Sequence, residues 1–128
     1  MPQVQPAPHE ALALSTQWLR AHLHRDAEFI RANAATPDDT AVHTIGSFPL
    51  EVTLAKFLQL LEASEPADIQ IESHPSGFVR NNVAWVTDLP RFRMPSGETR
   101  RGRQTIVMIE LHGAWKVVHS HLSRGVVG

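Results

Sequence analysis

The sequence contains no cysteine, and this absence excludes disulfides, thiolate metal ligands and thiol nucleophiles. It also contains no tyrosine, and no apolar run approaches the ~18–20 residues that a membrane-spanning helix requires. The first eight residues, MPQVQPAP, have neither a basic start nor an apolar centre, so they do not predict a secretory signal. We therefore expect a cytoplasmic protein that does not interact with a membrane.

The remaining composition is that of an ordinary globular chain. Of its 128 residues, 42% are hydrophobic and 20% are charged, which fits neither a disordered nor a fibrous protein. The length suits one compact domain of ~100–150 residues. We expect a loose N-terminal segment at 1–8 and a single domain at 9–128.

The net charge of −1 hides an uneven distribution along the chain. Residues 1–75 hold four basic and ten acidic residues (net −6), whereas residues 76–128 hold eight and three (net +5). Five of the ten arginines fall between Arg91 and Arg103. The isoelectric point near 6.7 argues against a dedicated nucleic-acid-binding protein. We interpret the stretch as a solvated hairpin that faces the acidic half or a partner subunit.

The pattern of apolar residues predicts helices in the first half of the chain. Helical spacing extends over about 9–24 and 26–35, and a short strand is expected at 41–46. A third helix follows, which Thr53 can cap and Glu65-Pro66 ends. Its apolar stripe consists of Leu54, Phe57, Leu58 and Leu61.

After Pro66 the apolar period changes from about 3.6 to 2, which is typical of strands. Strands are expected over 68–72, 78–87, 105–111 and 114–122. In a continuous strand over 78–87, Arg80 and Asn82 fall on the face opposite Trp85. Helices followed by antiparallel strands predict an α+β domain with the helices on one face of the sheet.

The turn at His112-Gly113 predicts how the last two strands pair. A uniform register places His119 opposite Ile106 and His121 opposite Gln104, on one shared face. Both faces of this hairpin are partly apolar, so both should be covered. Helices can cover one face, and we expect a second subunit to cover the other in a homodimer.

The last strand carries a family resemblance. Its sequence, Gly113-Ala114-Trp115-Lys116-Val117-Val118-His119-Ser120-His121-Leu122-Ser123, resembles the last strand of SnoaL-like domains in the nuclear transport factor 2-like superfamily. It is also similar to the end of the association domain of calcium/calmodulin-dependent kinase. The resemblance extends from about His9 to Ser123. It implies a cone-like curved antiparallel sheet packed on about three N-terminal helices.

The resemblance leaves the activity open, because this scaffold hosts isomerases, cyclases, hydrolases, dehydratases and non-catalytic binding or assembly domains. Without tyrosine, the chain lacks the phenolic oxyanion donor of ketosteroid isomerases. Leu122 stands where the kinase association domain has an arginine that could build an anion pocket. No cofactor is expected.

Histidines are the main candidates for chemistry. His43 and His121 are the weak catalytic candidates, since a histidine titrates near neutral pH and suits general acid–base work. His119 and His121 alone are too few to hold a metal ion, so no metal site is expected. The residues expected to contact a ligand are His43, Arg80, Asn82, Trp85, His119 and His121.

We therefore expect a small-molecule-binding or assembly domain with a mostly apolar pocket, because no nucleophile–base pair, phosphate loop or paired carboxylate is evident. The alternative is a lyase, isomerase or hydrolase that acts on a small hydrophobic substrate by histidine acid–base chemistry. A small hydrophobic ligand fits both interpretations, and nucleic acid fits neither. The sequence leaves open which histidines face a cavity and which face a dimer interface.

Overall fold

The structure is a computed structural model that describes residues 3–35, 42–45, 51–66 and 68–124. The side chains of residues 42–45, 51 and 124 lie outside this description. The elements in chain order are β1 (Gln5–Pro6), α1 (His9–Leu23), α2 (Ala27–Asn33), β2 (Val42–Ile45), β3 (Glu51–Thr53), α3 (Leu54–Glu62), β4 (Gln70–Glu72), β5 (Ser76–Arg80), β6 (Val83–Asp88), β7 (Arg91–Arg93), β8 (Thr99–Leu111) and β9 (Ala114–Arg124).

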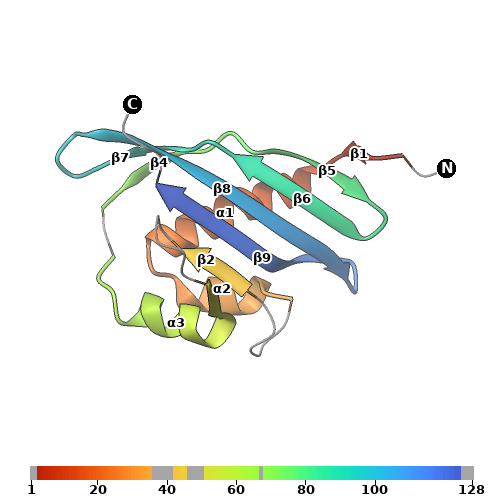
Figure 1. The fold of residues 1–128 in the computed structure, drawn as a ribbon, viewed down its shortest axis with the longest axis horizontal. Coiled ribbons are helices and arrows are strands. Elements are labelled where there is room, and N and C mark those ends of the chain that lie inside the picture. Colours follow the sequence, from red (N-terminus) through yellow and green to blue (C-terminus); the bar gives the residue numbers. More distant parts are fainter. Residues whose placement is uncertain (1–2, 36–41, 46–50, 67, 125–128) are drawn as a thin grey trace.

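The strands form one curved sheet in the order β1-β5-β6-β8-β9-β2-β3, with β4 and β7 as a short arm beside the start of β8. All pairs are antiparallel except β2 with β9. Figure 1 shows α1 crossing one side of the long strands, with α2 and α3 near the β2 end of the sheet. The predicted α+β cone is confirmed. No helix of the described residues is long and apolar enough to cross a membrane.

The third helix is confirmed as a core element. Its four stripe residues are all buried, and Phe57 is fully inaccessible. The Thr53 side chain accepts a hydrogen bond from the Lys56 backbone N–H at 3.2 Å, so this residue caps the helix as expected.

The core lies between the helices and the side of the sheet that we call the inner face. Gln104 of β8 defines this face, because its amide donates to the Ser15 carbonyl of α1 at 3.1 Å. The rings of Trp18 and Phe57 meet in the core with centroids 6.2 Å apart. The inner-face side chains that are completely buried against the helices are Ala84, Val86, Ile106, Met108 and Val117.

The arm has a small core of its own, built on Leu19, Phe92 and Leu122. Sequence patterning missed β7 and started β8 at residue 105 instead of 99. Gly102 is required here, because the Phe92 ring packs directly over its backbone and leaves no room for a Cβ atom. This close approach joins the arm to the rest of the sheet.

The strand expected over 78–87 is two strands joined by a tight turn. Asn81 adopts a left-handed backbone with φ of 55°, and Asn82 follows it in the turn. Since Arg80 pairs with Val83 and Phe78 with Trp85, Arg80 lies on the same face as Trp85, not opposite it.

The first strand also departs from the expectation. Gln5 and Pro6 pair with β5, although the segment 1–8 was expected to be loose. The backbone N–H of Ala7 extends this attachment with a 2.9 Å hydrogen bond to the Gly77 carbonyl. The described part of this segment is therefore an edge strand of the sheet.

The register expected for the last hairpin holds only near the turn. Met108 pairs with Val117 as predicted, but the next pair is Val107 with His119, so Val118 is an extra residue in a β-bulge. From this point each residue of β9 faces the side opposite to the predicted one. The predicted pairs of Ile106 with His119 and Gln104 with His121 are wrong.

Candidate functional site

The sheet face turned away from α1, which we call the outer face, is organised in three cross-strand rows. Directly paired residues share a face, so each row follows from the strand register. The apolar row is Phe78, Trp85, Val107 and His119; the polar row is Ser76, Thr87, Thr105 and His121; the mixed row is Arg80, Val83, Ile109 and Lys116.

An apolar row is unexpected on a sheet face that is not covered by helices. Phe78 is 50% exposed, and its ring lies 6.2 Å from that of Trp85. Trp85, Val107 and His119 are each half-buried although helices cover only the inner face. Exposed apolar patches of this kind mark interaction surfaces. We take this row and the mixed row as the candidate functional site.

The structure brings several of the predicted ligand residues to this one face. Trp85 and His119 lie in the apolar row, Arg80 lies in the mixed row, and His121 lies in the polar row. Arg80 and His121 are exposed. Asn82 is exposed in the turn next to these rows, and its carbonyl accepts a 2.9 Å hydrogen bond from the Glu110 backbone N–H.

His43 lies on β2, where its backbone position is opposite Val52 on one side and Ser120 on the other. The side chain of His43 lies outside the described residues. In β9 the buried residues near this position are Ser120 and Leu122, while His119 and His121 belong to the other face. His119 and His121 therefore lie across the sheet from the helices.

A groove of about 570 Å³ follows the polar row at one end of the sheet. Its outer-face lining includes Thr87, Arg103 and Thr105, with Leu89 at its rim. Leu89 is 64% exposed and follows the last residue of β6. The groove is shallow and open, and it offers mainly hydroxyl and guanidinium donors.

The inner face holds a few buried polar groups that are tied into structural contacts. Gln104 is 1% exposed and binds Ser15, as described above. Asp88 is 3% exposed, and its carboxylate accepts hydrogen bonds from the Ser73 hydroxyl and, at 3.0 Å, from the His74 backbone N–H. The Ser73 hydroxyl also lies 2.9 Å from that of Thr16 on α1. These contacts fasten the loop before β5 to α1 and β6.

In the described part of the chain, no group of three or more histidine, aspartate or glutamate side chains comes together to hold a metal ion. His119 and His121 in particular point from one strand to open surface rows. A metal centre there would need further ligands.

Sequence reasoning missed Phe78 and Val107 as members of the site. Phe78 shares the face of Trp85 only because of the Asn81-Asn82 turn, and His119 joins the face of Val107 only because of the Val118 bulge. Two adjacent asparagines are a turn signal, so the Asn81-Asn82 turn could have been predicted from the sequence. The bulge had no comparable signal in the sequence.

Solved structures share this fold over nearly the whole chain. An NTF2-like protein of unknown function from Pseudomonas putida KT2440 matches with 21% identity over 92% of this chain and 86% of its own, at a TM-score of 0.70. The association domain of CaMKII from C. elegans matches with 17% identity over 88% and 92%, at 0.69. A cystatin-like fold protein from Burkholderia xenovorans LB400 matches with 19% identity over 98% and 100%, at 0.69.

None of the curated proteins compared with the chain matches it. The family model of the SnoaL-like domain matches residues 11–127, which is nearly the entire chain. The structural neighbours agree with this match in fold, and their low identity carries nothing about activity. With the three helices and the curved sheet that this match implies, the chain belongs to the SnoaL-like domain family.

Proposed function

We propose that this chain is a non-catalytic assembly and small-molecule-binding domain that forms a symmetric homodimer through the outer face of its sheet. The observation that carries the proposal is the apolar row across four strands, from Phe78 through Trp85 and Val107 to His119. An antiparallel sheet with one wet face normally alternates apolar and polar residues, with the polar ones outward.

The size of the face suits a dimer. A standard stable interface buries ~800 Å² on each partner. That is about a tenth of the 7835 Å² surface of this chain. Two-fold pairing places the same patch on both sides of the contact, so that each apolar row packs against its own copy.

The placement of His121 supports binding over catalysis. An acid–base residue works in a site that excludes water and orients the substrate. His121 instead is exposed on the outer face, two residues beyond the apolar row. The ligand pocket belongs on the inner side of the cone, where apolar burial provides affinity and His43 is the proposed polar contact.

Self-association is tested by light scattering with two matched variants. The native chain should give about twice its 14.2 kDa mass at micromolar concentration. Phe78→Glu should give a monomer, because it puts a charge at the most exposed position of the apolar row. Leu89→Glu changes an apolar residue that is more exposed than Phe78 and lies outside the three rows, and it should remain dimeric. A native monomer, or two variants that behave alike, would contradict the dimer.

The ligand is tested by thermal shift with small hydrophobic carbonyl and carboxylate compounds. A compound that binds should raise the melting temperature. The shift should shrink in His43→Ala and remain in His121→Ala. Turnover of a bound compound that disappears in either variant would replace the binding proposal with the enzyme alternative.

A further inference from the structure

Four arginines project from one face of the arm formed by β4, β7 and the start of β8. All four are exposed, and they share a face because Arg91 pairs with Arg101 while Arg93 and Arg103 lie two residues away along their strands. We call these residues, Arg91, Arg93, Arg101 and Arg103, the arginine face.

The described residues place only one carboxylate against this charge. Like charges directly opposite each other on neighbouring strands are destabilising, and Arg91 and Arg101 are such a pair. Glu72 reaches Arg91 at 3.9 Å, a weak and exposed ion pair. Among the described residues, no carboxylate lies within ion-pair distance of Arg93, Arg101 or Arg103. The described acidic residues therefore leave this face positively charged.

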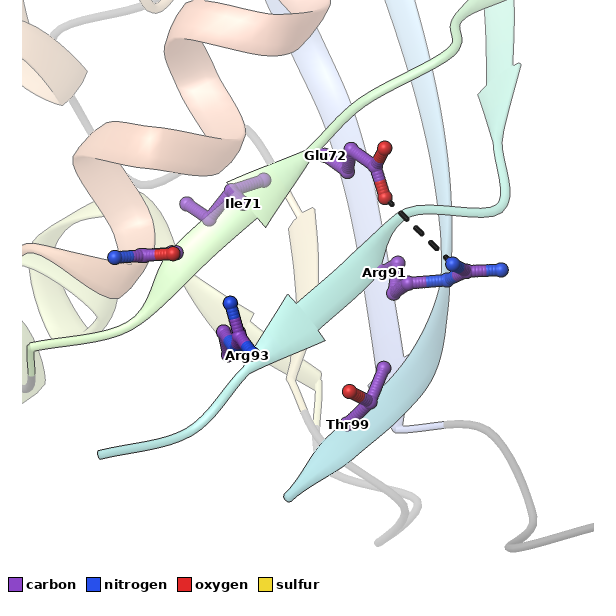
Figure 2. A pocket seen from close by; sticks show the side chains of 6 residues that line it. Ile71, Glu72, Arg91, Arg93 and Thr99 are labelled. Atoms are coloured by element: carbon purple, nitrogen blue, oxygen red, sulfur yellow. Dashed lines mark ion pairs between the residues drawn. The ribbon is translucent and has the colours of Figure 1, made fainter. Parts of the chain in front are cut away.

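The face is also hollowed. A groove of about 410 Å³ lies between β4, β7 and the start of β8, and its lining includes Gln70, Arg93 and Thr99. These three form one cross-strand row, so an amide, a guanidinium and a hydroxyl line up as donors. Figure 2 shows the ion pair between Glu72 and Arg91 beside this row, with Arg93 further along β7. The groove thus presents donors that suit anionic oxygens, and its one carboxylate, that of Glu72, faces Arg91.

We propose that the arginine face binds an extended acidic polypeptide segment that carries carboxylates at alternate positions. Alternate residues of a strand are ~6.6–6.8 Å apart, both in β7 and β8 and in an extended peptide laid along them. Arg91 with Arg93, and Arg101 with Arg103, therefore match the spacing of carboxylates at every second residue. Guanidinium groups bind carboxylates in a forked, two-bond geometry.

Two features favour a polypeptide over nucleic acid. Single-stranded nucleic acid is held by aromatic side chains on which bases stack, and no aromatic residue lines the groove. The aromatic residue of β7, Phe92, is buried on the opposite side of the arm. The arginine face lies beyond the apolar row, so this inference does not depend on the dimer.

The test uses the full chain and fluorescein-labelled ten-residue peptides in fluorescence anisotropy. The probe alternates glutamate and threonine, and three references accompany it: the same peptide with glutamine for glutamate, one with its five glutamates in a block, and a ten-nucleotide oligothymidylate. We expect the alternating peptide to bind most tightly. Its binding should weaken as salt is raised, since exposed charge pairs are screened.

Arginine variants locate the site. Arg93→Gln and Arg101→Gln should each weaken binding of the alternating peptide about two- to fivefold, and the double variant about tenfold. Arg20→Gln removes the same charge from an exposed position on α1 and should leave the affinity unchanged. The residues changed are exposed, and a circular dichroism spectrum checks that each variant is folded.

Four results would overturn the proposal. Equal binding of the glutamine peptide would show that carboxylates are not recognised, and equal binding of the block peptide would show that spacing is not. Tighter binding of oligothymidylate would assign the face to nucleic acid. An unchanged affinity in the folded double variant would place any peptide binding elsewhere on the molecule.

Discussion

Val107 of β8 pairs with His119 of β9, one step after Met108 pairs with Val117. The extra residue between the two pairs, Val118, reverses which side of the sheet the rest of β9 presents. His119 therefore completes the apolar row on the outer face, while Ser120 turns inward and is 5% exposed. One inserted residue therefore decides on which face of the sheet His119 and His121 lie.

The position of the bulge coincides with a change of neighbour along β9. On the edge away from β8, the Val117 carbonyl accepts a 2.7 Å hydrogen bond from the Ala35 backbone N–H. From His119 onward the same edge pairs with β2. The bulge thus separates two parts of β9 that have different partners, and it allows both parts to form their backbone hydrogen bonds.

Removing the extra residue should damage the protein more than changing its side chain. Deletion of Val118 would turn Ser120 and Leu122 outward, and burial of a leucine alone contributes about 1.5–3 kcal/mol. We expect the free energy of unfolding in urea to fall by at least about 2 kcal/mol. Val118→Thr keeps the residue count and should lose less than about 1 kcal/mol. A deletion variant as stable as the native chain would show that the register of β9 can slip freely.

The stripe on α3 should behave as a core. Phe57 is fully buried against Trp18 and the ring of His22, whose centroid lies 4.9 Å away. Phe57→Ala should therefore lower the unfolding free energy by about 3–5 kcal/mol in a urea titration. Lys56→Ala, at the exposed neighbouring position, should change it by less than about 0.5 kcal/mol. A loss below about 1 kcal/mol for Phe57→Ala would mean that the helix contributes little to the core.

Because Gly102 and Phe92 are in contact, substitutions at the two positions should have non-additive effects on the free energy of unfolding. A Cβ atom at position 102 would lie 2.8 Å from Cζ of the Phe92 ring, so Gly102→Ala forces the ring to move. We expect a loss of about 1–3 kcal/mol, as for other overpacked sites. Phe92→Leu, made in the same chain, should recover part of that loss, because the smaller side chain vacates the space. Strictly additive effects in chemical denaturation would rule out the contact.

The Asp88 carboxylate should hold the loop before β5 in place. Asp88→Ala leaves the Ser73 hydroxyl and the His74 backbone N–H without their acceptor, and hydrogen bonds to charged groups contribute about 1.5–3 kcal/mol each. Hydrogen exchange at the His74 amide should become at least tenfold faster. Asp88→Asn retains one acceptor oxygen and should show a smaller increase. Equal exchange rates in all three proteins would mean that the loop is held by other contacts.

Local patterns predicted much of the architecture correctly. The stripe from Leu54 to Leu61 and the cap at Thr53 identified α3, because a 3.6-residue period and a hydroxyl at the N-terminus act within one helix. The turn at His112-Gly113 fixed the register as far as Val117, since a two-residue turn determines only the pairs that follow without interruption.

The sequence identified some of the residues on the outer face but not their arrangement. Trp85, Arg80, His119 and His121 were all identified as candidates, and the sheet places them on one face. Strand parity, which decides the face, changes with a single inserted residue or an unrecognised turn. The Asn81-Asn82 turn put Arg80 on the face of Trp85, and the Val118 bulge put His119 and His121 on the outer face.

The sequence by itself determined the helices, most of the strands, the family and the residues from which a site can be built, because these depend on local period, turn chemistry and motif. Only the tertiary structure decided which face each strand residue occupies. That choice depends on how β9 meets Ala35 and β2 along one edge and β8 along the other, and Ala35 and β2 lie far from β9 in the chain. Local sequence carries no record of such contacts, because a bulge is stabilised by the partners of both edges together.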